Sequence, residues 1–351
     1  MQFDRRSLAG TRFFSAGLKC WAALATAVAL VSVAGFPSPA LGQEKAPAAK
    51  SDKDAPAIPE PEESDVPTGD RLHLALTYYP GVNQEGIQQG KGKKVIPIVL
   101  LHGWKQKRSD LNELAKGLQE LGHAVVVPDL RGHGGSTRWI GASRDDKLDA
   151  AKMPTPQFGL MVTQDMKAVK NFLWEKNNAA ELNIDKLCVV GSEMGASVAL
   201  GFAAFDAAGY EHGAVYYGSR KLGRFVKALV LISPKWSVPG LPLNRAMKDP
   251  AVQTDMAIMI LVGKKDTKAR TEAKRIYGMF KPWHPEPPES EDKVDKQTLF
   301  LGEFDTSLQG TKLLDQKFNV QGFIDDFVRR RLIKDDAARE WTWKERKSPN
   351  D

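Results

Sequence analysis

Two acidic residues follow apolar runs that read as strands, and a carboxylate in such a position can do chemistry. Glu193 is the centre of Gly191-Ser192-Glu193-Met194-Gly195, between an apolar run and a predicted helix. The flanking glycines permit a sterically tight turn there. Asp266 follows the apolar run that ends at Gly263. A carboxylate can act as a nucleophile, and two carboxylates can share acid–base work when their pKa values are pushed apart.

Three histidines lie near predicted strand ends or in loops. His102 precedes Gly103 and Trp104 after a buried run, His133 lies on the loop after the next run, and His284 lies in a Pro-rich segment. No zinc-type cluster, phosphate-binding glycine loop or dinucleotide fingerprint occurs, so the sequence predicts no metal and no cofactor.

Apolar runs that alternate with helical patterns must position these side chains. The continuous runs are typical of strands buried on both faces. They predict a mostly parallel central sheet with helices on both faces, in which ligands bind at the carboxyl ends of the strands. The predicted strands are 72–78, 95–101, 124–130, 187–190, 226–232, 257–262 and 298–301, and the predicted helices include 109–121, 158–177 and 194–205.

Four motifs make residues 72–333 resemble the α/β-hydrolase family. Their order along the chain is that of the family. They are His102-Gly103-Trp104, Asp129-Leu130-Arg131-Gly132-His133-Gly134-Gly135-Ser136, Gly191-Ser192-Glu193-Met194-Gly195 and Ile260-Leu261-Val262-Gly263-Lys264-Lys265-Asp266.

The resemblance implies a site in which two of the three catalytic positions hold unexpected residues. Glu193 stands where the family has its serine, Gln309 stands where it has its histidine, and Asp266 matches the acid. The resemblance also implies an oxyanion hole made by the backbone N–H groups of Trp104 and Met194, which the carboxylate of Glu193 could fill. The remaining cleft-lining residues would be His102, Gly103 and His133.

These replacements leave two functions open. A glutamine cannot take up a proton from a nucleophile at neutral pH, which favours weak or absent serine-hydrolase activity with a retained cleft for a small-molecule ligand or an ester-like substrate. The alternative is an active hydrolase that uses Glu193 as a nucleophile, or as acid or base with Asp266. No histidine follows His284, so the missing base would have to come from His133 or His284.

The chain divides into four predicted segments. Residues 1–42 combine basic residues, an apolar run and small residues, as in a cleavable signal peptide that leaves no stable membrane anchor. Residues 43–70 form a Pro-, Ala- and charge-rich disordered linker. The α/β domain spans 71–335 and a tail spans 336–351, and only a small insertion separates Ser233 from Met256, so no large cap domain is expected.

The signal peptide predicts an exported protein, periplasmic or extracellular. The formal net charge is +7, part of which lies in the signal peptide, and this is too small to indicate a nucleic-acid partner. The twin arginines Arg5 and Arg6 leave the export route open. Only Cys188 remains after cleavage, so no intrachain disulfide is expected.

Overall fold

The protein is described by a computed structural model over residues 58–82, 92–143, 146–209, 224–290, 292–333 and 341–348. The predicted signal peptide and residues 43–57 of the predicted linker lie outside the described residues. Within the described part, no helix is long and apolar enough to cross a membrane.

Eight strands form one sheet in the order β1-β2-β4-β3-β5-β6-β7-β8. β1 pairs antiparallel with β2 and β2 antiparallel with β4, whereas every other neighbouring pair is parallel. The predicted mostly parallel sheet is therefore confirmed. The strands are β1 Glu62–Pro67, β2 His73–Tyr79, β3 Pro97–Leu101, β4 Ala124–Pro128, β5 Leu187–Ser192, β6 Val226–Ile232, β7 Ala257–Gly263 and β8 Leu299–Phe304.

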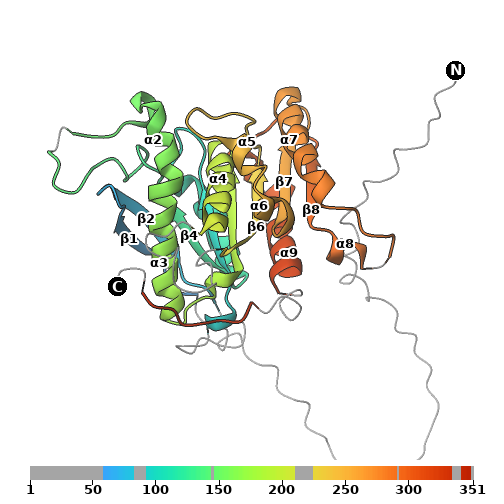
Figure 1. The fold of residues 1–351 in the computed structure, drawn as a ribbon, viewed down its shortest axis with the longest axis horizontal. Helices are drawn as coiled ribbons and strands as arrows, with labels where there is room; N and C mark the ends of the chain where they lie inside the picture. Colours follow the sequence, from blue (N-terminus) through green and yellow to red (C-terminus); the bar gives the residue numbers. More distant parts are fainter. Residues whose placement is uncertain are drawn as a thin grey trace, which may run out of the picture. The chain divides into compact units, whose positions relative to one another are not determined.

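Helices cover both faces of this sheet (Figure 1). Helices α1 and α9 pack on one face, and α2, α3, α4 and α7 pack on the other. The helices are α1 Asn112–Glu120, α2 Thr155–Leu160, α3 Met166–Asn178, α4 Met194–Ala208, α5 Leu243–Ala246, α6 Pro250–Thr254, α7 Thr267–Phe280, α8 Lys293–Lys296 and α9 Val320–Leu332.

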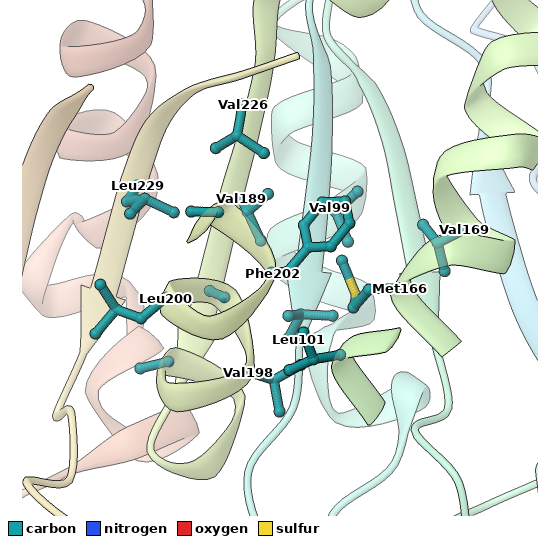
Figure 2. Close-up of a cluster of buried hydrophobic side chains, with 14 of the residues drawn as sticks. Val99, Leu101, Met166, Val169, Val189, Val198, Leu200, Phe202, Val226 and Leu229 are labelled. Atoms are coloured by element: carbon teal, nitrogen blue, oxygen red, sulfur yellow. The ribbon is translucent and has the colours of Figure 1, made fainter. Parts of the chain in front are cut away.

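Strand β3 shows why its sequence carries an unbroken apolar run. All five of its residues are buried, with Ile98 and Leu100 facing α1 and α9 while Val99 and Leu101 face α3 and α4. Successive side chains of a strand point to opposite faces, so a strand covered on both sides must be apolar throughout. Figure 2 shows the second of these two cores, where Phe202 and other α4 side chains meet β3 and α3.

The predicted linker ends earlier than residue 70. Glu62–Pro67 forms β1, and its backbone pairs along the length of β2. Glu63 accepts hydrogen bonds from Thr77 and Arg108, at 2.7 Å each. The segment lacks large apolar side chains because an edge strand is stabilised mainly through its backbone ladder and polar side-chain contacts.

The helix predicted over 158–177 is interrupted by a π-helical turn, η5 (Met161–Asp165), between α2 and α3. Asp165 lies in this turn and is fully buried against Arg131, whose Nη2 lies 2.6 Å from the carboxylate. Arg131 also pairs with Asp70 at 2.9 Å. The arginine of the Asp129–Ser136 motif thus ties the loop after β4 to the π turn.

Part of the predicted tail, residues 341–348, is held against the end of α3. Asn177 Nδ2 donates to the carbonyl of Lys344 at 2.9 Å, and Trp343 Nε1 donates to the carbonyl of Asn177 at 3.1 Å. Asn177 Oδ1 also accepts the N–H of Ile184 at 3.2 Å. These bonds attach the tail to a buried asparagine whose side-chain oxygen and nitrogen both have hydrogen-bond partners.

We expect Asn177→Ala to lower the free energy of unfolding by about 2 kcal/mol, because the N–H of Ile184 and the carbonyl of Lys344 both lose their partner. Urea denaturation of the purified protein measures this loss. Asn244→Ala, at an exposed position of α5, is the matched control and should leave the midpoint unchanged. Equal midpoints for the Asn177 variant and the parent would contradict a stabilising role for the bonds between Asn177, the tail and Ile184.

Between β6 and β7 the structure holds only the short helices α5 and α6. This confirms that no large cap covers the carboxyl ends of the strands. Helix α6 ends just before the amino end of β7, so it lies toward the end of the strands opposite to Glu193.

Candidate functional site

Glu193 lies in a tight turn between β5 and α4. Its backbone has φ 49° and ψ −107°, in the positive-φ region that non-glycine residues seldom adopt. A Cβ atom on Gly191 would lie 2.3 Å from the carbonyl oxygen of Gly195, and one on Gly195 would lie 2.4 Å from that of Leu101. The glycines are therefore required by close backbone approach, and they bring the start of α4 against the end of β3.

The side chain of Glu193 points between two backbone turns and a lysine. A Cβ atom on Gly103 would lie 3.0 Å from Glu193 Oε2, and one on Gly310 would lie 3.0 Å from Glu193 Cδ. Lys235 Nζ lies 3.4 Å from Glu193 Oε1. The Glu193 side chain is 28% exposed and that of Lys235 is 38% exposed, so the pair lies at the mouth of the site.

The Glu193 carboxylate does not fill the predicted oxyanion hole. Neither Trp104 N–H nor Met194 N–H donates to the Glu193 carboxylate within the described residues. The ammonium group of Lys235 provides an ionic partner on the solvent side, which accounts for the direction of the carboxylate. Both N–H groups also lack an acceptor elsewhere in the described structure, as expected for the first N–H of a helix at Met194.

Gln309 is bound to the ends of β6 and β7. Its Oε1 accepts the hydroxyl of Ser233 at 2.7 Å, and its Nε2 donates to the carbonyl of Gly263 at 2.8 Å. Ser233 Oγ in turn accepts the N–H of Gly310 at 2.9 Å. The amide therefore fastens the loop after β8 to its neighbours, and it makes no hydrogen bond to Glu193.

Asp266 acts as the N-cap of α7. Its carboxylate accepts the N–H of Ala269 at 3.0 Å, which satisfies one of the free donors of the helix start. No hydrogen bond joins it to Gln309 or to Glu193 within the described residues. The three triad-equivalent side chains thus have three separate sets of partners.

His102 supports the turn after β3. Its Nδ1 donates to the carbonyl of Gly103 at 2.8 Å, and its Nε2 accepts the N–H of Leu130 at 3.0 Å. Complete burial lowers the pKa of His102 to about 4. This imidazole is neutral and fully engaged, so it is not available as a base.

His133 packs beside His102 and Trp104, with ring centroids 4.9 Å and 5.6 Å away. Its Nδ1 donates to the carbonyl of Arg131 at 3.0 Å, while its buried Nε2 has no hydrogen-bond partner. Burial lowers the pKa of His133. The ring therefore presents an unused lone pair near Trp104, whose indole is 37% exposed and stacks on Phe158.

His284 lies away from Glu193, at the other end of the sheet's strands. Its Nδ1 contacts the hydroxyl of Thr298 at 2.8 Å, directly before the amino end of β8, whereas Glu193 follows the carboxyl end of β5. Ser192 and Ser197 are both buried, and neither hydroxyl has a hydrogen-bond partner. Neither serine is paired with a histidine that could activate it.

Sequence reasoning missed Lys235 and Ser233. Both follow β6 at its carboxyl end. Sequence reasoning also missed Gln106, which donates to the hydroxyl of Thr311 at 2.7 Å and accepts the N–H of Gly103 at 2.8 Å. Only their place in the sequence could have indicated these residues, since residues just after parallel strands gather at one edge of the sheet.

A family model described as the alpha/beta hydrolase family matches residues 98–344, which include the turn after β3, the elbow at Glu193 and the loop after β8. The chain belongs to the α/β-hydrolase family. No curated protein sequence matches it.

Solved α/β-hydrolase structures resemble this chain in fold. Dienelactone hydrolase from Anabaena variabilis gives a TM-score of 0.52 at 13% identity, over 79% of this chain and 100% of that one. An esterase from Pyrococcus furiosus gives 0.50 at 16% identity, over 78% and 93%. At these identities the likeness concerns the α/β-hydrolase fold alone.

Proposed function

We propose that this α/β-hydrolase-fold chain is an exported protein with weak or no serine-hydrolase activity, and that its cleft binds a small ligand with an ester-like or carboxylate oxygen. The observation that carries the proposal is the separation of the triad-equivalent side chains: Glu193 pairs with Lys235, Gln309 with Ser233 and Gly263, and Asp266 with the start of α7. No proton relay joins them.

The free backbone donors support a retained binding cleft. The N–H groups of Trp104 and Met194 lack acceptors in the described structure, and the positive end of the α4 dipole lies at Met194. A ligand oxygen can satisfy these donors. Beside them, the exposed indole of Trp104 offers an apolar surface, and Lys235 offers a positive charge.

A second candidate is an active hydrolase in which Glu193 is the nucleophile. His133 favours it, because its buried Nε2 has an unused lone pair and its ring adjoins Trp104. A neutral imidazole of this kind could take a proton from the water that attacks a glutamyl ester. Lys235 opposes this role, since an ion pair weakens a carboxylate as a nucleophile.

Hydrolysis of short and medium acyl esters by the purified protein separates the two candidates. We expect no turnover above the small residual rate that an oxyanion hole alone supports, and no further loss in Glu193→Gln. Turnover that disappears in both Glu193→Gln and His133→Gln would establish the carboxylate mechanism. Turnover only in the double variant Glu193→Ser/Gln309→His would mean that the scaffold is intact and its chemistry absent.

Binding is tested separately by saturation-transfer NMR with methyl butyrate as the probe. We expect transfer to the ester in the parent protein and its loss in Trp104→Ala. Trp283→Ala is the matched control, because that indole is 52% exposed and lies away from the strand ends that form the site. Equal transfer in the two variants would contradict a cleft at Trp104.

Export rests on the sequence of residues 1–42 alone. The expected result is a mature chain that begins near residue 43 and is recovered from the periplasm or the medium. Mass spectrometry of the protein from each cell fraction measures this. A chain that still carries residues 1–42 and occurs only in the cytoplasmic fraction would contradict it.

A further inference from the structure

A cavity of about 500 Å³ lies between α4, α5 and the segment formed by α2 and η5. This volume is within the range of about 300–1,000 Å³ that small-molecule sites occupy. Small residues on α2 and α4 border the space, and its walls are mostly hydrocarbon. Its lining includes Gly159, Val162, Gly201, Ala204, Phe205 and Leu243.

The cavity is separate from the Glu193 site. Gly201, its first α4 residue, lies two turns beyond the elbow, and the lining extends along the helix to Ala208. At about 1.5 Å of rise per residue, Gly201 is already roughly 10 Å along the helix from Met194. A Cβ atom on Gly201 would lie 2.9 Å from Val162 Cγ2, so the glycine is needed where α4 approaches η5.

One charged side chain at the edge of this cavity has no partner. Arg245 lines the cavity from α5, is exposed, and makes no ion pair or side-chain hydrogen bond with the described residues. The other charged residue of the lining, Asp249, accepts the N–H groups of Ala251 and Val252 at the start of α6. Its carboxylate is therefore engaged, and the guanidinium remains available.

We propose that this cavity binds a fatty acid or a similar single-chain carboxylate, with the hydrocarbon chain along the surface that α4, α5 and the α2–η5 segment form and the carboxylate on Arg245. The apolar walls favour the chain because its burial removes hydrocarbon from water. A guanidinium at the edge favours a carboxylate, which it can bind through two parallel hydrogen bonds. The site goes beyond the proposed function, since it shares no residue with the cleft at Glu193.

Isothermal titration of the purified protein with dodecanoate, below its micelle concentration, tests the proposal. We expect saturable binding at one site. Arg245→Gln should weaken dodecanoate binding by about tenfold through the lost charged hydrogen bonds, and should leave dodecanol binding unchanged. Ala204→Phe, which fills the cavity, should weaken the binding of both amphiphiles.

Two variants serve as controls. Lys248→Gln removes an exposed positive charge close to Arg245 that does not line the cavity, and it should bind dodecanoate like the parent. Glu193→Gln should also bind like the parent, which separates this site from the elbow cleft. Dodecanoate affinity that is unchanged in Arg245→Gln, or equally reduced in Lys248→Gln, would overturn the proposal. Because Arg245 is exposed, its variant is informative even if Ala204→Phe fails to fold.

Discussion

Arg131→Met is expected to lower the free energy of unfolding by about 3–5 kcal/mol, the loss typical of breaking a buried ion pair from one side. The Arg131 and Asp165 side chains are both fully buried. The guanidinium makes four hydrogen bonds to the carboxylates of Asp165 and Asp70, at 2.6–3.1 Å. Burial raises the pKa of Asp165. Without the guanidinium this carboxyl group keeps only the backbone N–H of residue 131 as a partner, so it must stay charged without a counter-ion or hold a proton.

Urea denaturation at neutral pH measures this effect. The double variant Arg131→Met/Asp165→Leu should recover much of the loss, because it removes the uncompensated charge together with its partner. Arg270→Met is the matched control, since it breaks an exposed pair with Glu303 on the surface and should shift the midpoint little. If Arg131→Met is as stable as the parent, the ion pair does not stabilise the contact between the loop after β4 and the π turn.

Acidification from pH 6.5 to pH 4 should lower the free energy of unfolding by about 3 kcal/mol through His102 alone. Its pKa is about 4 in the folded protein against 6.5 for a free histidine. Within this window the unfolded chain binds a proton that the folded chain does not, so stability decreases as the pH falls. Above pH 6.5 both states hold neutral imidazole and the contribution is constant. Burial lowers the pKa of His133 and His284 as well, which acts in the same direction.

The pH dependence is measured by urea denaturation in steps between about pH 7.5 and about pH 4, values chosen to span the window between the two pKa values. His102→Gln should flatten this dependence, although it is less stable at pH 7 because the bonds to Gly103 and Leu130 are disturbed. His73→Gln, at an exposed position, is the control and should retain the slope of the parent. An equal slope in the parent and in His102→Gln would exclude a buried neutral His102.

The proposed loss of chemistry is consistent with how the triad-equivalent positions are used. Gln309 and Ser233 link the loop after β8 to β6 and β7, and Asp266 caps α7. Each of these contacts stabilises the fold, so these residues have a structural role that does not depend on catalysis. A Gln309→His variant would lose the amide bond to Ser233, and Asp266 would have to leave its N-cap position to contact the new imidazole.

Local sequence was sufficient for the layered fold and the tight turn at Glu193. Strands buried on both faces require continuous apolar runs, and β6 has the bounds predicted from its pattern. The glycines around Glu193 indicated a turn that close backbone approach indeed requires. The sequence alone also identified Glu193 at the centre of this turn and Gln309 in the stretch after the last strand.

Only the tertiary structure decided the partners of the polar side chains. Lys235 reaches Glu193 because β5 and β6 are neighbours in the sheet, a relation that depends on strand order and leaves no local pattern. The parallel direction of β8 places His284, which contacts Thr298 before that strand, at the opposite end of the strands. The polar segment Glu62–Pro67 became β1 because β2 offered it a free edge. Periodicity encodes which side chains are buried, whereas long-range pairing determines which charges meet, and the pairing depends on the whole sheet.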